Sequence, residues 1–125
     1  MRSYAILIIL FFSLAFAPLG FAQGKASTEI PYLLNLIKTS SFTFERNGQN
    51  GSGKSAAELL QFKFNQSKNK IHTTEEFIEN VASFSGHTKK SYHVILPGGE
   101  KILLKDFLYE ELKKLRAKTK NGKSP

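Results

Sequence analysis

The stretch GQNGSGKS, Gly48–Ser55, carries the residues of a phosphate-binding loop in the spacing G-x-x-x-x-G-K-[ST]. In such a loop the backbone N–H groups surround the phosphates, the lysine reaches them, and the final hydroxyl helps to hold Mg²⁺. Nucleotide binding at this stretch is therefore the first chemical hypothesis that the sequence raises.

The surroundings of this stretch do not favour a nucleotide site. The strand before a working phosphate loop is normally a continuous apolar run, because both faces of its sheet are covered. Here Phe42–Arg46 alternates apolar and polar residues, and the only aspartate, Asp106, stands at an expected helix start. We therefore keep nucleotide binding as the lesser alternative. Instead, Ser55 and Glu58 predict a capping box that starts a helix.

The other residues that could do chemistry do not form a catalytic or metal-binding set. The histidines, His72, His87 and His93, fall on three different expected elements. Ser85 lies near His87, but no acid is placed to orient that histidine. The chain has no cysteine, which excludes disulfides and thiolate sites. We expect no cofactor, no metal and no enzymatic activity.

Arg46-Asn47-Gly48 offers binding chemistry. Arg46 leaves the end of an expected strand, where its guanidinium either bonds backbone carbonyls or grips an anionic ligand. If that strand pairs with the strand that follows residue 90, the turn and the loop before Tyr92 form one polar groove, with Thr88 in that loop. The candidate ligand-binding residues are Arg46, Asn47, Ser83, Ser85, Lys90 and Tyr92.

The N-terminal segment, residues 1–22, has the form of an export signal. Arg2 supplies the positive start and Tyr4–Phe16 the apolar run, and small residues lead to a cut between Ala22 and Gln23. An uncleaved anchor is the alternative, because no charge interrupts the segment after Arg2. We expect a periplasmic or secreted protein that acts on another envelope component.

The net charge of +8 is concentrated at the C-terminus. Basic and acidic residues nearly balance before Lys113, so no nucleic-acid partner is expected. The alternative function is attraction of the basic segment to anionic lipid or lipopolysaccharide. Residues 119–125 are expected to be disordered, and the domain to be a monomer. The basic residues concerned are Lys113, Lys114, Arg116, Lys118, Lys120 and Lys123.

Hydrophobic periodicity predicts a single α+β domain over residues 23–118. Two or three antiparallel strands are expected under about four helices, in the order α-β-α-α-β-β-α. Ser27 or Thr28 is expected to cap the first helix, and Thr73 with Glu76 forms another capping box. The expected elements are a helix up to Thr39, a strand over Phe42–Arg46, a mobile loop to Gly53, helices over Ala56–Lys68 and from Thr73 to Gly86, strands over Ser91–Leu96 and Lys101–Leu104, and a helix from Asp106.

Four segments carry a likeness to a known family: FERNG at 44–48, KIHT at 70–73, FIENVASFS at 77–85 and KSYHV at 90–94. Their order resembles that of the YfeK-like family of small exported bacterial proteins, a domain of unknown function. This chain departs from the family pattern at Lys89 and Ser91, where the pattern has glycine and proline, and at His72, where aspartate is common. The resemblance implies export and an α+β fold. It implies no catalytic residues, and the pattern does not require G-K-S after R-N-G.

Overall fold

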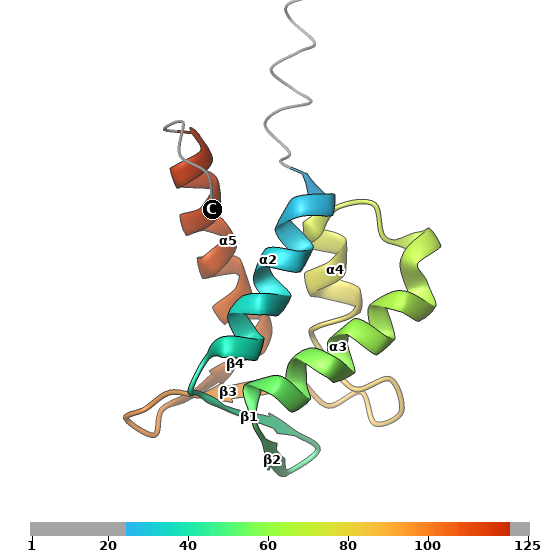
Figure 1. Cartoon of the computed structure of the whole chain (residues 1–125). Coiled ribbons are helices and arrows are strands. Elements are labelled where there is room, and N and C mark those ends of the chain that lie inside the picture. The colour runs from blue at the N-terminus through green and yellow to red at the C-terminus, as the bar shows by residue number, and fades with distance from the viewer. Residues whose placement is uncertain (1–24, 121–125) are drawn as a thin grey trace, which may run out of the picture.

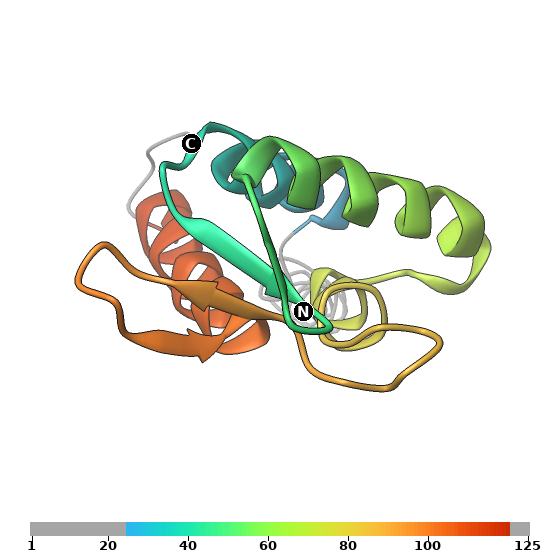
Figure 2. The same cartoon turned by 90° about the horizontal axis from the view of Figure 1, so that it is seen from below.

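A four-stranded antiparallel sheet with four helices on one side of it makes up residues 25–120, the part that the computed structural model describes (Figures 1 and 2). The order is α-β-β-α-α-β-β-α, so the α+β class is confirmed and one strand more than expected is present. The elements are α2 (Ala26–Thr39), β1 (Thr43–Arg46), β2 (Gln49–Gly51), α3 (Gly53–Ser67), the 3₁₀ turn η1 (Lys68–Lys70), α4 (Thr74–Asn80), β3 (His93–Ile95), β4 (Lys101–Leu103) and α5 (Leu104–Lys120).

The additional strand is β2, which lies in the segment expected to be a mobile loop. Asn47 and Gly48 have φ of 54° and 82°, the left-handed values that a tight hairpin turn needs. The turn folds β2 back onto β1, with Arg46 opposite Gln49 and Phe44 opposite Gly51. Hydrophobic periodicity could not identify this strand, because none of its three residues is apolar.

The sheet has the strand order β2-β1-β3-β4, so the first hairpin lies beside the second. At the centre Phe44 of β1 pairs with Val94 of β3, and both side chains are buried against the helices. This pairing, which the polar-groove hypothesis required, is confirmed. It brings the Asn47-Gly48 turn close to the loop between α4 and β3.

Each of the four helices has a boundary that differs from the expected one. Helix α5 begins at Leu104 and not at Asp106. Helix α3 begins at Gly53 and is capped by Ser52, whose Oγ accepts a hydrogen bond from the Ser55 N–H at 3.1 Å, so the predicted Ser55–Glu58 capping box is wrong. Helix α2 follows Lys25 and has no side-chain cap. Helix α4 ends at Asn80 and not at Gly86. The Thr73–Glu76 capping box is confirmed.

The core lies between the sheet and the helices, and α5 contributes one long apolar stripe to it. Leu104, Leu108, Leu112 and Leu115 are buried at helical spacing. The helix continues through Lys120, two residues beyond the expected end of the domain. The predicted signal segment and its cut between Ala22 and Gln23 lie outside the described residues. Within residues 25–120, no helix is long and apolar enough to span a membrane.

Candidate functional site

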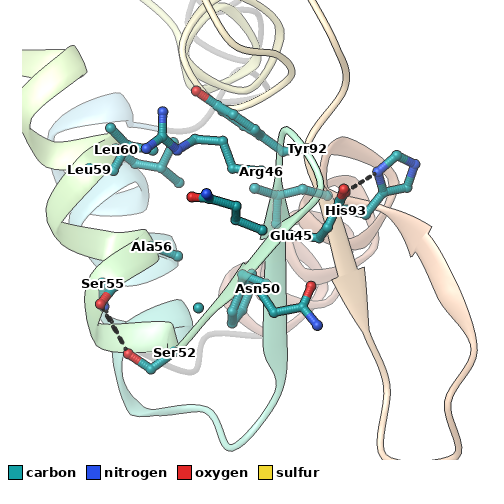
Figure 3. A pocket seen from close by; sticks show the side chains of 14 residues that line it. Glu45, Arg46, Asn50, Ser52, Ser55, Ala56, Leu59, Leu60, Tyr92 and His93 are labelled. Carbon is teal, nitrogen blue, oxygen red and sulfur yellow. Dashed lines mark hydrogen bonds and ion pairs between the residues drawn. The ribbon is translucent and has the colours of Figure 1, made fainter.

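A pocket of about 250 Å³ opens between the β1–β2 hairpin and helix α3 (Figure 3). Ala56, Leu59 and Leu60 of α3 form an apolar wall, and Phe44 of β1 adds to it. The rest of the lining is largely polar and comes from the hairpin, the start of α3 and the beginning of β3. The main polar residues there are Glu45, Arg46, Asn50, Ser52, Ser55, Tyr92 and His93.

The stretch that spells a phosphate loop forms part of this pocket but is not folded as a phosphate loop. Its first glycine lies in the hairpin turn, its middle is the strand β2, and its end opens α3. Lys54 is exposed, and its Nζ lies 3.8 Å from Oε2 of Glu58 on the same helix. Since Gln49–Gly51 pair with β1, their backbone does not curl around a central anion as such a loop requires.

Gly53 has a packing role that accounts for its place in this stretch. A Cβ at this position would lie 2.1 Å from the carbonyl oxygen of Ile37 and 3.1 Å from Ser40 Oγ. The start of α3 therefore lies directly against the end of α2. Only glycine allows the two backbones to approach so closely.

Arg46 and Tyr92 are the two candidate binding residues that line the pocket. Arg46 is exposed at the end of β1, and its side chain extends across the pocket toward Leu59 and Leu60 (Figure 3). Tyr92 is buried, and its hydroxyl lies at the same end of the pocket (Figure 3). Burial raises the pKa of the Tyr92 hydroxyl, and the positive charge of Arg46 opposes that rise.

Lys63 of α3 is the functional candidate that sequence reasoning missed. Its Nζ donates to the carbonyl oxygen of Phe84 at 2.8 Å and to the Tyr92 hydroxyl at 2.9 Å. Burial, together with the positive charges of Arg46 and Lys89, lowers the pKa of Lys63 to about 8. The available signal was its spacing: Lys63 follows Leu59 and Leu60 by one helical turn, on the side that faces the pocket and the core.

The other candidate residues are brought close to the hairpin but serve mainly to hold the loop. Asn47 Nδ2 donates to Ser85 Oγ at 3.5 Å, and Thr88 Oγ1 donates to Asn47 Oδ1. Ser83 is buried and donates to the carbonyl oxygen of Ile78. Lys90 is exposed and does not line the pocket. The structure thus gathers these residues on one side of the molecule, with Arg46 and Tyr92 alone at the pocket.

Glu45 and His93 form the wall of the pocket nearest the centre of the sheet. Glu45 Oε1 lies 3.0 Å from His93 Nδ1 (Figure 3). Glu45 Oε2 accepts from the Gly48 N–H at 2.7 Å. Burial opposes ionisation of Glu45, but the Gly48 N–H, His93 and Lys101 outweigh it and lower the pKa of this carboxyl. Its charge is therefore used to hold the hairpin turn.

The basic C-terminal segment does not act as one group in the described residues. Arg116 donates to Glu29 and Glu75, with Nη1 to Glu75 Oε2 at 2.6 Å, so its guanidinium is engaged within the domain. Lys114 Nζ lies 3.2 Å from Glu111 Oε2, so this lysine is paired on its own helix. Lys113, Lys118 and Lys120 are exposed, and polyanion binding through them stays a prediction.

No group of three or more histidine, aspartate or glutamate side chains converges as a metal site would require within residues 25–120. The pocket's two best-placed titratable groups, Glu45 and His93, bond each other. The pocket places an apolar wall beside the charged guanidinium of Arg46, so it can contact both an apolar part and a polar or charged part of a ligand.

The fold and the pocket define a small α+β domain with a half-apolar pocket at one end of its sheet. Residues 24–116 match the Family of unknown function (DUF5329), and the chain belongs to that family. A relative in Salmonella typhimurium, the uncharacterized protein YfeK, is 40% identical over 71 residues, which are 56% of this chain and 59% of the relative. The matched part thus covers less than two thirds of that relative's length. No solved structure matches this chain.

Proposed function

We propose that this protein is an exported, non-catalytic module that binds a small amphipathic ligand in the pocket between the β1–β2 hairpin and α3. The observation that carries the proposal is the division of the pocket. Leu59 and Leu60 present apolar surface on one side, and Arg46 crosses it with a charged end. Ligand sites combine apolar surface with polar groups that fix the orientation of the ligand, and this pocket has both, with a larger polar share than is usual.

The size of the pocket narrows the class of ligand. Its volume of about 250 Å³ lies just below the range of roughly 300–1,000 Å³ that is usual for drug-sized molecules. The site therefore suits a short-chain compound, or one end of a larger envelope component. A module that holds such a component for another protein would fit an exported domain of this size.

The engagement of the polar side chains supports the non-catalytic part of the proposal. A general base must be able to reach the proton of a substrate, and a nucleophile needs a base beside it. His93 Nδ1 is bonded to Glu45, and Ser85 Oγ accepts from Asn47 Nδ2. Within residues 25–120 no hydrogen bond joins a serine hydroxyl to a histidine. Export is supported by the form of residues 1–22.

Titration with two short amphiphiles tests the proposal. We expect 1-hexanol and hexanoate, added to the ¹⁵N-labelled protein, to shift the amide signals of Phe44, Ala56 and Leu60 in a saturable way. Leu59→Ser should weaken both ligands at least about tenfold, since the side chain lies in the apolar wall. Phe62→Ser on the same helix is the matched control, because Phe62 is 60% exposed and does not line the pocket.

Two results would overturn the proposal. The first is the absence of saturable shifts at the pocket, or equal binding by the folded Leu59→Ser variant. The second concerns catalysis: turnover of ester or phosphomonoester substrates that is abolished by Ser85→Ala or Arg46→Ala would show that the module is an enzyme.

A further inference from the structure

We propose that one end of this pocket is an oxyanion site, in which Arg46, Lys63 and Lys89 together receive the carboxylate or phosphate group of the ligand. The location of the ligand's apolar part rests on the proposed function above. The oxyanion contact does not, because it follows from the positions of the basic side chains. Lys63 bonds the Tyr92 hydroxyl, and Arg46 reaches the same end of the pocket. Lys89 lies over the ring of Phe84, the residue whose carbonyl oxygen also accepts from Lys63. The three basic residues come from three separate segments: β1, α3 and the loop before β3.

The Lys63 ammonium group is held in place but not fully used. A lysine ammonium has three N–H donors. Two acceptors, the Phe84 carbonyl oxygen and the Tyr92 hydroxyl, engage two of these donors. The third donor has no acceptor in the described structure. A half-buried, immobilised ammonium with one donor left over is suited to bind an anion without further loss of side-chain freedom.

The charges around Lys63 are of one sign. Arg46 and Lys89 are close enough to lower the pKa of Lys63. None of the three forms an ion pair in residues 25–120. Glu45, the neighbour of Arg46 in sequence, is instead directed to His93 (Figure 3), and it also accepts from the Gly48 N–H.

An unpaired cluster of like charges costs free energy, most of all where one member is partly removed from water. A bound anion would remove this cost, and the cluster would then contribute to ligand affinity. Of the three basic residues, Arg46 lines the pocket directly. Lys63 and Lys89 are not lining residues, and Lys63 joins the site through its hydrogen bond to the Tyr92 hydroxyl.

The geometry of the basic groups indicates which anions fit. The planar guanidinium of Arg46 matches the paired oxygens of a carboxylate or phosphate, while Lys63 acts as a point charge. The apolar wall at Leu59 begins where the Arg46 side chain ends (Figure 3). The preferred ligand is therefore an amphipathic oxyanion, with its charged group at Lys63 and its hydrocarbon on α3.

The decisive measurement is the pKa of Lys63, followed by NMR of ¹³C-labelled lysine side chains. In chloride alone we expect a value of about 8. Inorganic phosphate at equal ionic strength should raise it, because an anion favours the charged form of the amine. Hexanoate should do the same, and should bind at least about tenfold more tightly than 1-hexanol.

Substitution of Arg46 separates this site from general charge attraction. Arg46→Gln should weaken phosphate and hexanoate about tenfold, the loss expected for one charge-assisted hydrogen bond. It should also raise the pKa of Lys63 in chloride alone, because a like charge is removed. Lys118→Gln, on the exposed end of α5, removes the same charge elsewhere and should change neither quantity.

An unchanged Lys63 pKa in both phosphate and hexanoate would overturn the oxyanion site, as would phosphate affinity that Arg46→Gln leaves intact. Equal affinity for hexanol and hexanoate would also overturn it while leaving the proposed amphiphile pocket standing. Conversely, phosphate could raise the pKa of Lys63 while hexanol does not bind at all. That result would support the oxyanion site and reject the proposed binding of an apolar group at Leu59 and Leu60. A response to hexanoate but not to phosphate would restrict the site to carboxylates.

Discussion

At the scale of single residues, Lys89 stands out because its backbone conformation does not suit its side chain. Its φ is 64°, in the left-handed region that side chains with a Cβ adopt at a cost of about 1–2 kcal/mol. The pattern of the YfeK-like family has glycine here, and glycine is the residue that this conformation favours. The left-handed conformation therefore gives a physical reason for a glycine at this position, and nothing in the structure explains the lysine.

Replacement of Lys89 by glycine should stabilise the protein. We expect Lys89→Gly to raise the free energy of unfolding by about 1 kcal/mol, because it relieves the left-handed strain. Urea unfolding followed by circular dichroism measures the change. Lys89→Ala is the matched control, since it removes the same charge and the contact of Lys89 with the Phe84 ring but keeps the Cβ. If the glycine variant is no more stable than the alanine variant, the strain explanation is wrong.

At the scale of elements, the contact between α2 and α3 decides how the glycine-rich stretch is used. Two serines, Ser52 and Ser55, were each able to cap a helix at this point. The close approach of Gly53 to the Ile37 carbonyl places the first turn of α3 at residue 53, which makes Ser52 the cap. Glycine at this site thus serves helix packing in place of phosphate binding.

A methyl group at position 53 should disrupt that contact. Gly53→Ala would place its Cβ 2.1 Å from a backbone oxygen, so α2 and α3 must separate. We expect a loss of about 2–3 kcal/mol in the free energy of unfolding, at the upper end of overpacking costs. Thermal unfolding would show it as a lower Tm.

Gly86→Ala provides the comparison for this substitution. No heavy atom lies within 4 Å of a Cβ built there, so the same chemical change should be nearly neutral. Similar stabilities for the two variants would contradict the packing role of Gly53. If the glycine served phosphate binding instead, the Gly53→Ala variant should keep its stability and lose only its affinity for the anion.

At the scale of the whole molecule, Arg116 connects three helices that are distant in sequence. From α5 it donates to Glu29 of α2 and to Glu75 of α4. Glu29 is only 6% exposed and also accepts from Thr74 Oγ1 at 2.6 Å. A buried carboxylate requires such partners, because an unpaired charge away from water is costly.

Removal of the guanidinium should destabilise the entire domain. We expect Arg116→Met to lower the free energy of unfolding by about 3 kcal/mol, since Glu29 is left buried without its cation. Lys114→Met, which removes an exposed pair with Glu111, should change it by less than about 0.5 kcal/mol. Urea unfolding at neutral pH compares the two. Equal effects would mean that the Arg116 cluster is no more than a surface ion pair.

The free energy of unfolding of Arg116→Met should also differ from that of the unmodified protein in its dependence on pH. Hydrogen bonds from Arg116 lower the pKa of Glu75 below its usual value of 4.5, against the effect of burial. A carboxyl whose pKa is lower in the folded state stabilises that state above its unfolded pKa. The stabilisation is lost as the pH falls below 4.5 through the lowered value. In Arg116→Met these hydrogen bonds are missing, so the loss of stability that Glu75 causes below pH 4.5 should be absent. Urea unfolding of both proteins over a range of acid pH measures this difference.

Much of the secondary structure followed from local signals in the chain. Periodic apolar residues identified the helices, the Thr73–Glu76 capping box was correct, and Asn47-Gly48 identified a turn. These features depend on residues within one or two turns of each other, so a single sequence contains them. The family resemblance likewise rested on local order and spacing, and the family match confirms it.

Tertiary structure alone decided the rest. Strand β2 forms because the turn returns it to β1, and its own side chains carry no apolar signal. Lys63 became a candidate only when α3 placed it beside Tyr92, Arg46 and Lys89. The sequence by itself thus determined which segments are helical, which are extended apart from β2, and which face of each is apolar. The choice of Ser52 as the cap of α3, the pocket and the cluster of charges depend on contacts between residues far apart in the chain, because the burial and the distances that define them do not exist until the elements pack.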